Sequence, residues 1–244
     1  MRNDFNSNGR GPWEARWSQA EKRAPVFNAP PVVVWTITAL GLCYVFFALS
    51  PPALQERLGD QLGFEPARFF AGPAGNGGVV AWLGRLFTHV FVHASFAHIA
   101  FNSLWLLAFG APVARRVGAA WRFLALFLLS GAAGALFFSL FHMNEYTVLV
   151  GASGGVTGLL GALIRFGFRR PNLFSTAPPR LLKLTDPTVL AWSAVIIVLN
   201  VSTEFVGAGF GAGDARIAWE AHIGGFLFGL LAIPLFDRPH PRIA

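Results

Sequence analysis

The amino-acid sequence predicts an all-α membrane protein, a bundle of six transmembrane helices with a long, partly helical first extracytoplasmic loop. Three observations predict this class. Apolar residues make up 54% of the 244 residues, and mean hydropathy is +0.53. Charged residues make up only 13%, about half the share of a typical soluble domain. Lysines and arginines fall in clusters between apolar runs, as topology signals do, and not in the single stripe of a nucleic-acid-binding protein.

Six apolar segments are predicted to span the membrane, since about 20 apolar residues cross about 30 Å of hydrocarbon. A polar cytoplasmic arm at 1–30 precedes this six-span domain at 31–236, and a short cytoplasmic tail follows at 237–244. The first apolar run ends in Ser50-Pro-Pro without a small-residue cleavage pattern, so no cleavable signal peptide is expected. The six predicted spans are residues 31–49, 96–112, 119–141, 152–168, 188–203 and 219–236.

The connection between the first two spans, residues 51–94, is expected to contain interfacial or re-entrant structure. Its later half, residues 79–92, is semi-apolar but is interrupted by Arg85 and His89, with His93 directly after it. Exposing these groups to lipid would be costly. This segment is therefore not expected to be a lipid-facing span.

The basic residues indicate the orientation of the chain. Fifteen of the 19 lysines and arginines lie in the arm, in the second and fourth loops with their flanks, or in the tail. Because cytoplasmic loops are enriched in basic residues, both termini are expected in the cytoplasm. The single cysteine, Cys43, rules out an internal disulfide and a cysteine metal cluster, and no metal or other cofactor is expected.

This orientation brings four polar side chains to one depth near the outer ends of three spans. Ser153 lies at the start of the fourth span, and His222 lies three residues into the sixth. His98 and Asn102 enter with the second span, and their i, i+4 spacing puts them on one helix face. Ionisable groups are expensive inside a membrane, so their convergence favours a functional site.

Each of these side chains also has a simpler explanation. A serine among small residues often packs against its neighbours or bonds to its own helix, and a histidine near a span end is often an interfacial group. Asn102 alone would fit an interhelical hydrogen bond, which is also the role expected of Ser193 and Asn200 in the fifth span. Only the shared depth favours chemistry over packing.

The residues around the serine allow a second interpretation. Gly151-Ala-Ser153-Gly-Gly155 fits the strand-to-helix turn of a soluble α/β-hydrolase, with residues 146–150 as its strand. That fold would need alternating strands and helices and an acid between the serine and a later histidine. Such acids are present, but the apolar composition and the asymmetry of basic residues argue against this alternative.

Glycines are expected to bring the fourth and sixth spans together. Small residues four positions apart let the backbones of two membrane helices approach closely. Such an approach would bring Ser153 toward His222. The glycines expected to support this packing are Gly151, Gly154, Gly158, Gly225 and Gly229.

These motifs resemble those of the rhomboid family of intramembrane serine proteases, in order and spacing, over roughly residues 82–230. The chain departs from the family pattern at two positions. Gly84 precedes Arg85 where many relatives have tryptophan, and Thr157 stands where relatives often have an aromatic residue that stacks on the catalytic histidine. The matching motifs are Arg85-Leu-Phe-Thr-His89, His98-Ile-Ala-Phe-Asn102, Gly151-Ala-Ser153-Gly154 and Ala221-His222-Ile-Gly-Gly225-Phe-Leu-Phe-Gly229.

The resemblance implies a rhomboid-like six-helix bundle and an intramembrane serine endopeptidase. Ser153 would be the nucleophile and His222 the general base, without an acidic third member. Asn102, His98 and the Ser153 backbone N–H would stabilise the oxyanion, and Arg85 would belong to the first-loop motif. Substrates would be transmembrane segments of other proteins within the lipid bilayer. The compact six-span form suggests the inner membrane of a bacterium.

Two further expectations concern a lid over the site and an alternative function. The glycine-rich residues 205–213 are expected to form a flexible lid above the site. The main alternative to a protease is a catalytically silent rhomboid-like protein that binds membrane clients, or a transporter that uses the same polar cluster. Silent relatives usually lack the serine or the histidine, and this chain has both.

Overall fold

The computed structural model describes residues 29–168, 180–206 and 218–237, and within these ranges it is helical without a strand. One isolated antiparallel bridge joins Phe64 to Leu149. Residues 1–28 of the predicted arm, the predicted lid beyond residue 206 and the tail beyond residue 237 lie outside the described residues. The helices are α2 (Pro31–Leu49), α3 (Pro52–Leu62), α4 (Pro66–Phe70), η1 (Pro73–Asn76), α5 (Val79–Thr88), η2 (His89–Phe91), α6 (Phe96–Val117), α7 (Ala120–His142), α8 (Ser153–Ile164), α9 (Pro187–Val206) and α10 (Trp219–Phe236).

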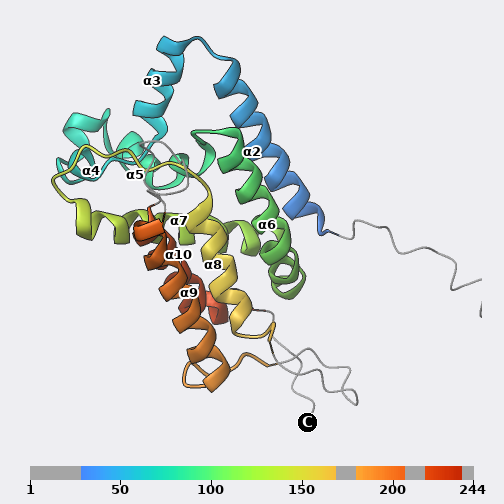
Figure 1. Cartoon of the computed structure of the whole chain (residues 1–244). Helices are drawn as coiled ribbons and strands as arrows, with labels where there is room; N and C mark the ends of the chain where they lie inside the picture. Colours follow the sequence, from blue (N-terminus) through green and yellow to red (C-terminus); the bar gives the residue numbers. More distant parts are fainter. Residues whose placement is uncertain (1–28, 169–179, 207–217, 238–244) are drawn as a thin grey trace, which may run out of the picture.

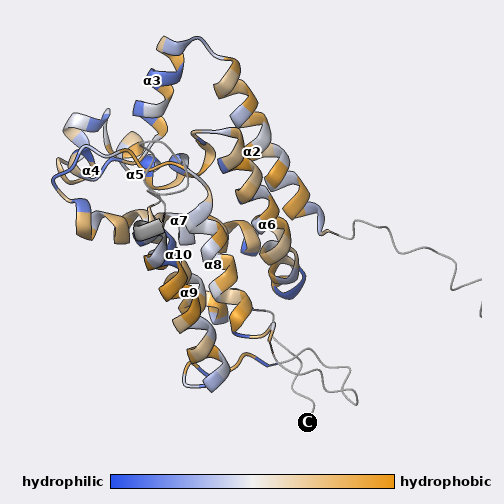
Figure 2. Ribbon diagram, viewed as in Figure 1, coloured by the Kyte–Doolittle hydropathy of each residue, from blue (hydrophilic) through white to orange (hydrophobic). Residues whose placement is uncertain are grey.

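A helix occurs at each of the six predicted spans (Figure 1). Four of them, α2, α6, α7 and α10, are long and apolar enough to cross a membrane, whereas α8 and the described part of α9 are apolar but shorter. Hydrophobic residues predominate on these helices, and α3 is rich in hydrophilic residues (Figure 2). The prediction of an all-α membrane protein is confirmed at this level.

Two predicted boundaries were wrong. Helix α6 continues through Pro112 to Val117 and ends at Gly118, whose φ of 71° is left-handed. Helix α8 is shorter than predicted and ends at Ile164. Arg165, which follows it, is buried and donates hydrogen bonds to the carbonyls of Leu182 and Leu230. Arg165 therefore belongs to the packed interior and is not a free loop charge.

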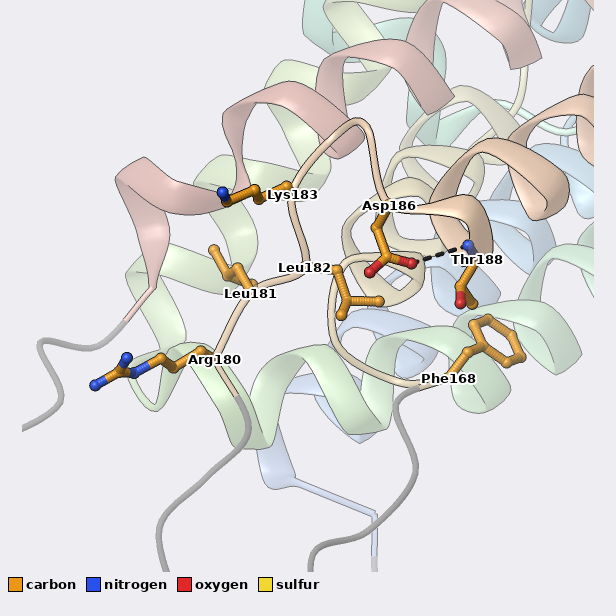
Figure 3. A pocket seen from close by; sticks show the side chains of 7 residues that line it. All are labelled: Phe168, Arg180, Leu181, Leu182, Lys183, Asp186 and Thr188. Carbon is orange, nitrogen blue, oxygen red and sulfur yellow. Dashed lines mark hydrogen bonds between the residues drawn. The ribbon is translucent and has the colours of Figure 1, made fainter.

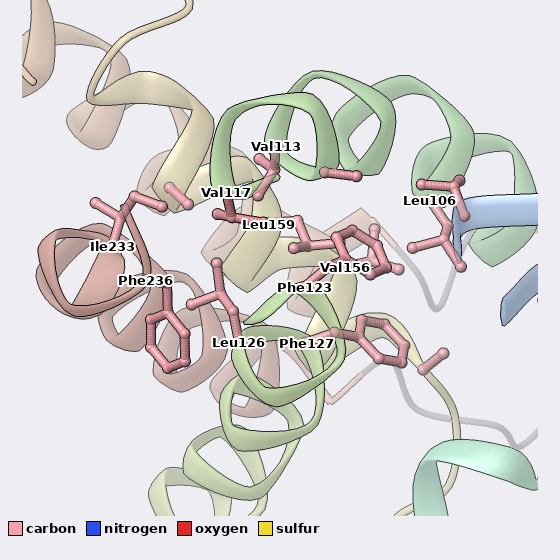
Figure 4. Close-up of a cluster of buried hydrophobic side chains, with 14 of the residues drawn as sticks. Leu106, Val113, Val117, Phe123, Leu126, Phe127, Val156, Leu159, Ile233 and Phe236 are labelled. Atoms are coloured by element: carbon pink, nitrogen blue, oxygen red, sulfur yellow. The ribbon is translucent and has the colours of Figure 1, made fainter. Parts of the chain in front are cut away.

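The core lies where α6, α7, α8 and α10 meet (Figure 4). Its apolar side chains are fully or nearly fully buried, and α2 packs against the outer side of α6 (Figure 1). Helix α8 lies between α7, α10 and α6, so the residue at its start is held by three neighbours. The labelled core residues are Leu106, Val113, Val117, Phe123, Leu126, Phe127, Val156, Leu159, Ile233 and Phe236.

Helices α3, α4 and α5 lie near the end of the bundle at which α8 begins (Figure 1). Hydrogen bonds hold this connection in place. Arg85 is 7% exposed and donates from Nη1 to the backbone carbonyls of Asp60 and Gly63. Trp82 Nε1 donates to the Phe69 carbonyl at 2.7 Å. Gly84, in place of the family's tryptophan, thus does not leave this connection unanchored.

Candidate active site

Ser153 is the first residue of α8 and follows a sharp turn. Gly151 has φ of +114°, a conformation that L side chains rarely adopt, and its N–H donates to the His89 carbonyl at 2.9 Å. The Ala152 N–H donates to His93 Nε2 at 3.3 Å. The first intrahelical bond of α8 runs from Val156 N–H to the Ala152 carbonyl. The Ser153 N–H, in the first helical turn, has no acceptor one turn before it in the helix.

His98 lies beside this turn. Ser95 caps α6 by accepting the His98 backbone N–H at 3.1 Å, which starts the helix just before the histidine. A Cβ on Gly151 would come within 2.5 Å of His98 Nε2, so only glycine leaves room for the ring there. The rings of His93 and His98 meet edge to face, with centroids 5.0 Å apart.

Asn102 follows His98 by one helical turn on the same face of α6 and is 4% exposed. Among the described residues, its Nδ2 has no hydrogen-bond partner. A buried donor without an acceptor costs on the order of 1–3 kcal/mol, so this amide needs a partner. The donor is available to a negatively charged oxygen.

His222 lies in the first turn of α10 and is half-buried, as Ser153 is. Its Nδ1 is 2.9 Å from Asn200 Oδ1 of α9. Its backbone carbonyl lies 2.9 Å from the Thr157 hydroxyl of α8, which is equally close to the Ser153 carbonyl of its own helix. Thr157, which stands where relatives often have an aromatic ring, therefore lies at the contact between the serine helix and the histidine helix.

The glycines of α8 and α10 lie against each other. A Cβ on Gly225 would overlap the Gly154 carbonyl, and one on Gly229 would overlap the Gly158 carbonyl. A Cβ on Gly154 would lie 3.4 Å from the carbonyl oxygen of Ala221, the residue before His222. The two backbones are thus in contact at the level of the serine and the histidine.

The electrostatics around the turn favour neutral imidazoles. Burial lowers the pKa of His93 from 6.5 to about 4, and the neighbouring His98 contributes to the shift. Neutral His93 has one ring nitrogen free to accept, which is the role that its Nε2 has toward the Ala152 N–H. In the first connection, the hydrogen bond from Arg68 lowers the pKa of Asp60.

The predicted residues thus fall into two groups. The segments that carry Ser153, His98 and His222 are in direct contact, with Asn102 one turn below His98, whereas Arg85 lies in α5 and anchors the first connection. The interpretation of the sequence missed one contact of this site. Asn200 was expected to make an interhelical hydrogen bond, and it does so between α9 and α10, but its partner there, the ring of His222, was not predicted. The only signal in the sequence was an amide inside an apolar segment.

The other end of the bundle holds a hollow of about 620 Å³ (Figure 3). None of the predicted site residues lines it, and the Asp186 carboxylate within it accepts the Thr188 N–H at 2.9 Å, which starts α9. Among the described residues, no group of three or more His, Cys, Asp or Glu is arranged to hold a metal ion. The lining residues are Phe168, Arg180, Leu181, Leu182, Lys183, Asp186 and Thr188.

The apolar helices and the buried polar cluster define a multi-pass helical membrane protein. The family model "Rhomboid domain" matches residues 81–238. The chain is 32% identical over 155 residues to "Rhomboid protease GluP" of Bacillus subtilis, covering 64% of this chain and 26% of that protein. It is 31% identical over 156 residues to "RHOMBOID-like protein 5" of Arabidopsis thaliana, covering 64% and 45%. It is 28% identical over 160 residues to "Rhomboid protease GlpG" of Serratia proteamaculans, covering 65% and 49%.

The chain belongs to the rhomboid family. It spans about a quarter of the length of the first of these relatives and less than half of the second. The shared segment includes the turn before α8, α8 itself and α10, which together carry the serine and the histidine. Membership supports a protease at the level of the family.

Proposed function

We propose that this protein is an intramembrane serine endopeptidase that cleaves transmembrane segments of other membrane proteins, with Ser153 and His222 as its catalytic dyad. One observation carries the proposal. The Gly154 backbone, next to Ser153, lies so close to α10 that a Cβ on Gly225, three residues after His222, would overlap the Gly154 carbonyl. The first-turn N–H groups of α8 lack intrahelical acceptors, and Asn102 Nδ2 has no partner among the described residues, so both would be donors for an oxyanion.

The proposed reaction is acyl transfer in two halves. Ser153 Oγ attacks the carbonyl carbon of the scissile peptide while its proton passes to His222. The oxyanion accepts hydrogen bonds from the Ser153 N–H, Asn102 Nδ2 and His98. Collapse breaks the C–N bond, and His222 gives its proton to the leaving amine. Water then attacks the acyl-enzyme and loses a proton to His222, and that proton returns to Ser153 as the ester breaks.

The membrane arrangement is part of the proposal. Six helices, α2 and α6 to α10, would span the bilayer of a bacterial inner membrane with both termini in the cytoplasm. Ser153 and His222 would then lie near the outer surface, where water reaches them. The reaction needs that water, since hydrolysis of the acyl-enzyme consumes one molecule of it.

The test uses the full chain in detergent micelles or liposomes. A fluorophosphonate probe is expected to label the wild type and the Ser139→Ala control, whose serine bonds to its own helix, but not Ser153→Ala. Ser153→Ala and His222→Ala are each expected to abolish cleavage of a model transmembrane substrate. Equal cleavage by Ser153→Ala would overturn the proposal. Substrate binding without labelling or cleavage would support the silent, client-binding alternative.

A further inference from the structure

The hydrogen bond between Asn200 and His222 determines which nitrogen of the imidazole carries the proton. Asn200 Nδ2 donates to the Ile196 carbonyl at 2.9 Å, one turn earlier in α9. An amide nitrogen only donates and an amide oxygen only accepts. The opposite side of the same amide, Oδ1, therefore faces His222 Nδ1 at 2.9 Å and requires a hydrogen on that nitrogen.

This arrangement leaves a single form of the neutral ring. Neutral imidazole carries one N–H, so a hydrogen on Nδ1 leaves the lone pair on Nε2. The Thr157 hydroxyl contacts only the backbone carbonyl of His222, and such a contact does not set the rotation of the ring. The contact with Asn200 sets both the rotation and the tautomer.

We propose that Asn200 is a positioning residue that holds His222 with Nε2 as the proton acceptor for Ser153. The proposal rests on the serine protease function proposed above. It gives the dyad a neutral third member, which orients the base as an acid does in a Ser-His-Asp triad but without a negative charge. A charged acid would have to be desolvated inside an apolar bundle, and an amide avoids that cost.

The alternative role of the contact between Asn200 and His222 is purely structural: it would only hold α9 against α10. The two roles differ in what they change. If the bond is only structural, its loss lowers the fraction of folded protein, and every molecule that still folds keeps the same tautomer and pH profile. If the bond positions the ring, its loss changes the tautomer of His222 in molecules that remain folded.

The first test measures the ring directly. In ¹⁵N-histidine NMR spectra of the full chain in micelles at pH 7.5, with the His222 signals assigned by their loss in His222→Gln, wild-type His222 is expected in the Nδ1–H form. Asn200→Leu is expected to give a mixture of tautomers. The Ser202→Ala control, two residues along α9 with its hydroxyl bonded to the Val198 carbonyl, is expected to match the wild type. Retention of the pure Nδ1–H form in Asn200→Leu would overturn the proposal.

The second test measures catalysis. Asn200→Leu is expected to lower kcat about 10–100-fold with little change in KM, the same range as for loss of the hydrogen-bond partner behind a metal-binding histidine. In Asn200→Asp, a carboxylate beside the ring would favour the imidazolium, so the acidic limb of the kcat/KM profile is expected to move about 1–3 pH units upward. His98 is the titratable neighbour from α6, and Glu220 on α10 is bound to His142, so both remain as in the wild type.

The two tests separate this proposal from the protease function. If the wild type is not labelled and does not cleave, the protease function fails, while NMR still decides whether Asn200 holds the tautomer. If the wild type cleaves and Asn200→Leu keeps its kcat within twofold, positioning fails and the dyad stands. A kcat loss that equals the loss of folded protein, with an unchanged pH profile for Asn200→Asp, also overturns positioning.

Discussion

Two histidines at the same end of the bundle have opposite surroundings. His222 faces a neutral amide oxygen at 2.9 Å and is half-buried. His142, the last residue of α7, lies between two carboxylates, with Nδ1 2.8 Å from Glu145 and Nε2 3.0 Å from Glu220. Burial lowers the pKa of His142, but the hydrogen bonds to the two carboxylates outweigh it and raise that pKa above 6.5, which favours the cation that donates from both ring nitrogens.

The difference shows how one bundle assigns two roles to one residue type. A histidine that donates from both nitrogens has no lone pair and cannot act as a base, so His142 serves as a clamp between α7 and α10. A histidine with one amide partner keeps a lone pair and can take a proton. The partner residue, and not the histidine, distinguishes the structural ring from the proposed catalytic one.

The largest expected effect separates the two rings by activity. His222→Gln is expected to lower cleavage of a transmembrane substrate by about 10³-fold or more, because no other group would accept the serine proton. The unfolding transition in mixed micelles should change little. His142→Gln, measured per folded molecule, is the matched control and should cleave within about twofold of the wild type. Equal activity losses in both variants would contradict the assigned roles.

The second effect separates them by stability. His142→Gln leaves the Glu220 carboxylate, whose side chain is 6% exposed, without its cation. Breaking a buried ion pair by removing one partner costs about 3–5 kcal/mol, which an unfolding titration would detect. Glu145→Gln is the control, since that side chain is 51% exposed and exposed pairs contribute about 0–1 kcal/mol. A larger loss in Glu145→Gln would show that the clamp depends on the exposed acid.

A third histidine, His93, is expected to make the stability of the protein depend on pH. His93 is buried with a pKa of about 4, below the unfolded value of 6.5. The contribution of neutral His93 to the free energy of unfolding is complete above pH 6.5. It is lost as pH falls from 6.5 toward 4, because the unfolded chain then binds a proton that the folded chain does not. The change is on the order of 3 kcal/mol at 1.36 kcal/mol per pH unit. Unfolding free energies at pH 7.5 and 4.5 should differ less in His93→Gln, and an unchanged difference would contradict this assignment.

The smallest expected effect concerns the spacing of the two proposed catalytic helices. Gly225→Ala inserts a Cβ into the Gly154 carbonyl, and overpacking of this kind costs about 1–3 kcal/mol. Probe labelling should fall as well, because α10 moves away from Ser153. Gly41→Ala in α2, where a Cβ meets nothing within 4 Å, is the control and should not destabilise the protein. Normal labelling of Gly225→Ala would show that the dyad tolerates a wider spacing.

Much of the architecture could be predicted from local pattern. Long apolar runs have to be helical because lipid offers no partner to backbone groups, and so α2, α7 and α10 were predicted close to their observed bounds, as was the start of α6. The ends of helices were less predictable. Pro112 stays inside α6 and Arg165 turns inward, because tertiary contacts decide whether a helix continues and whether a charge is free. The six-span count, the orientation and the position of residues 51–94 in the membrane stay predictions.

The sequence by itself determined the class of the protein and its candidate nucleophile, since composition and motif spacing are local properties of the chain. Only the tertiary structure distinguished the partners of its histidines. His142 with its two acids and His222 with Asn200 are formed by residues up to 78 positions apart, and no periodicity encodes such pairings. A hydrogen bond depends on positions within a few tenths of an ångström, and those positions exist only once α7, α9 and α10 have packed.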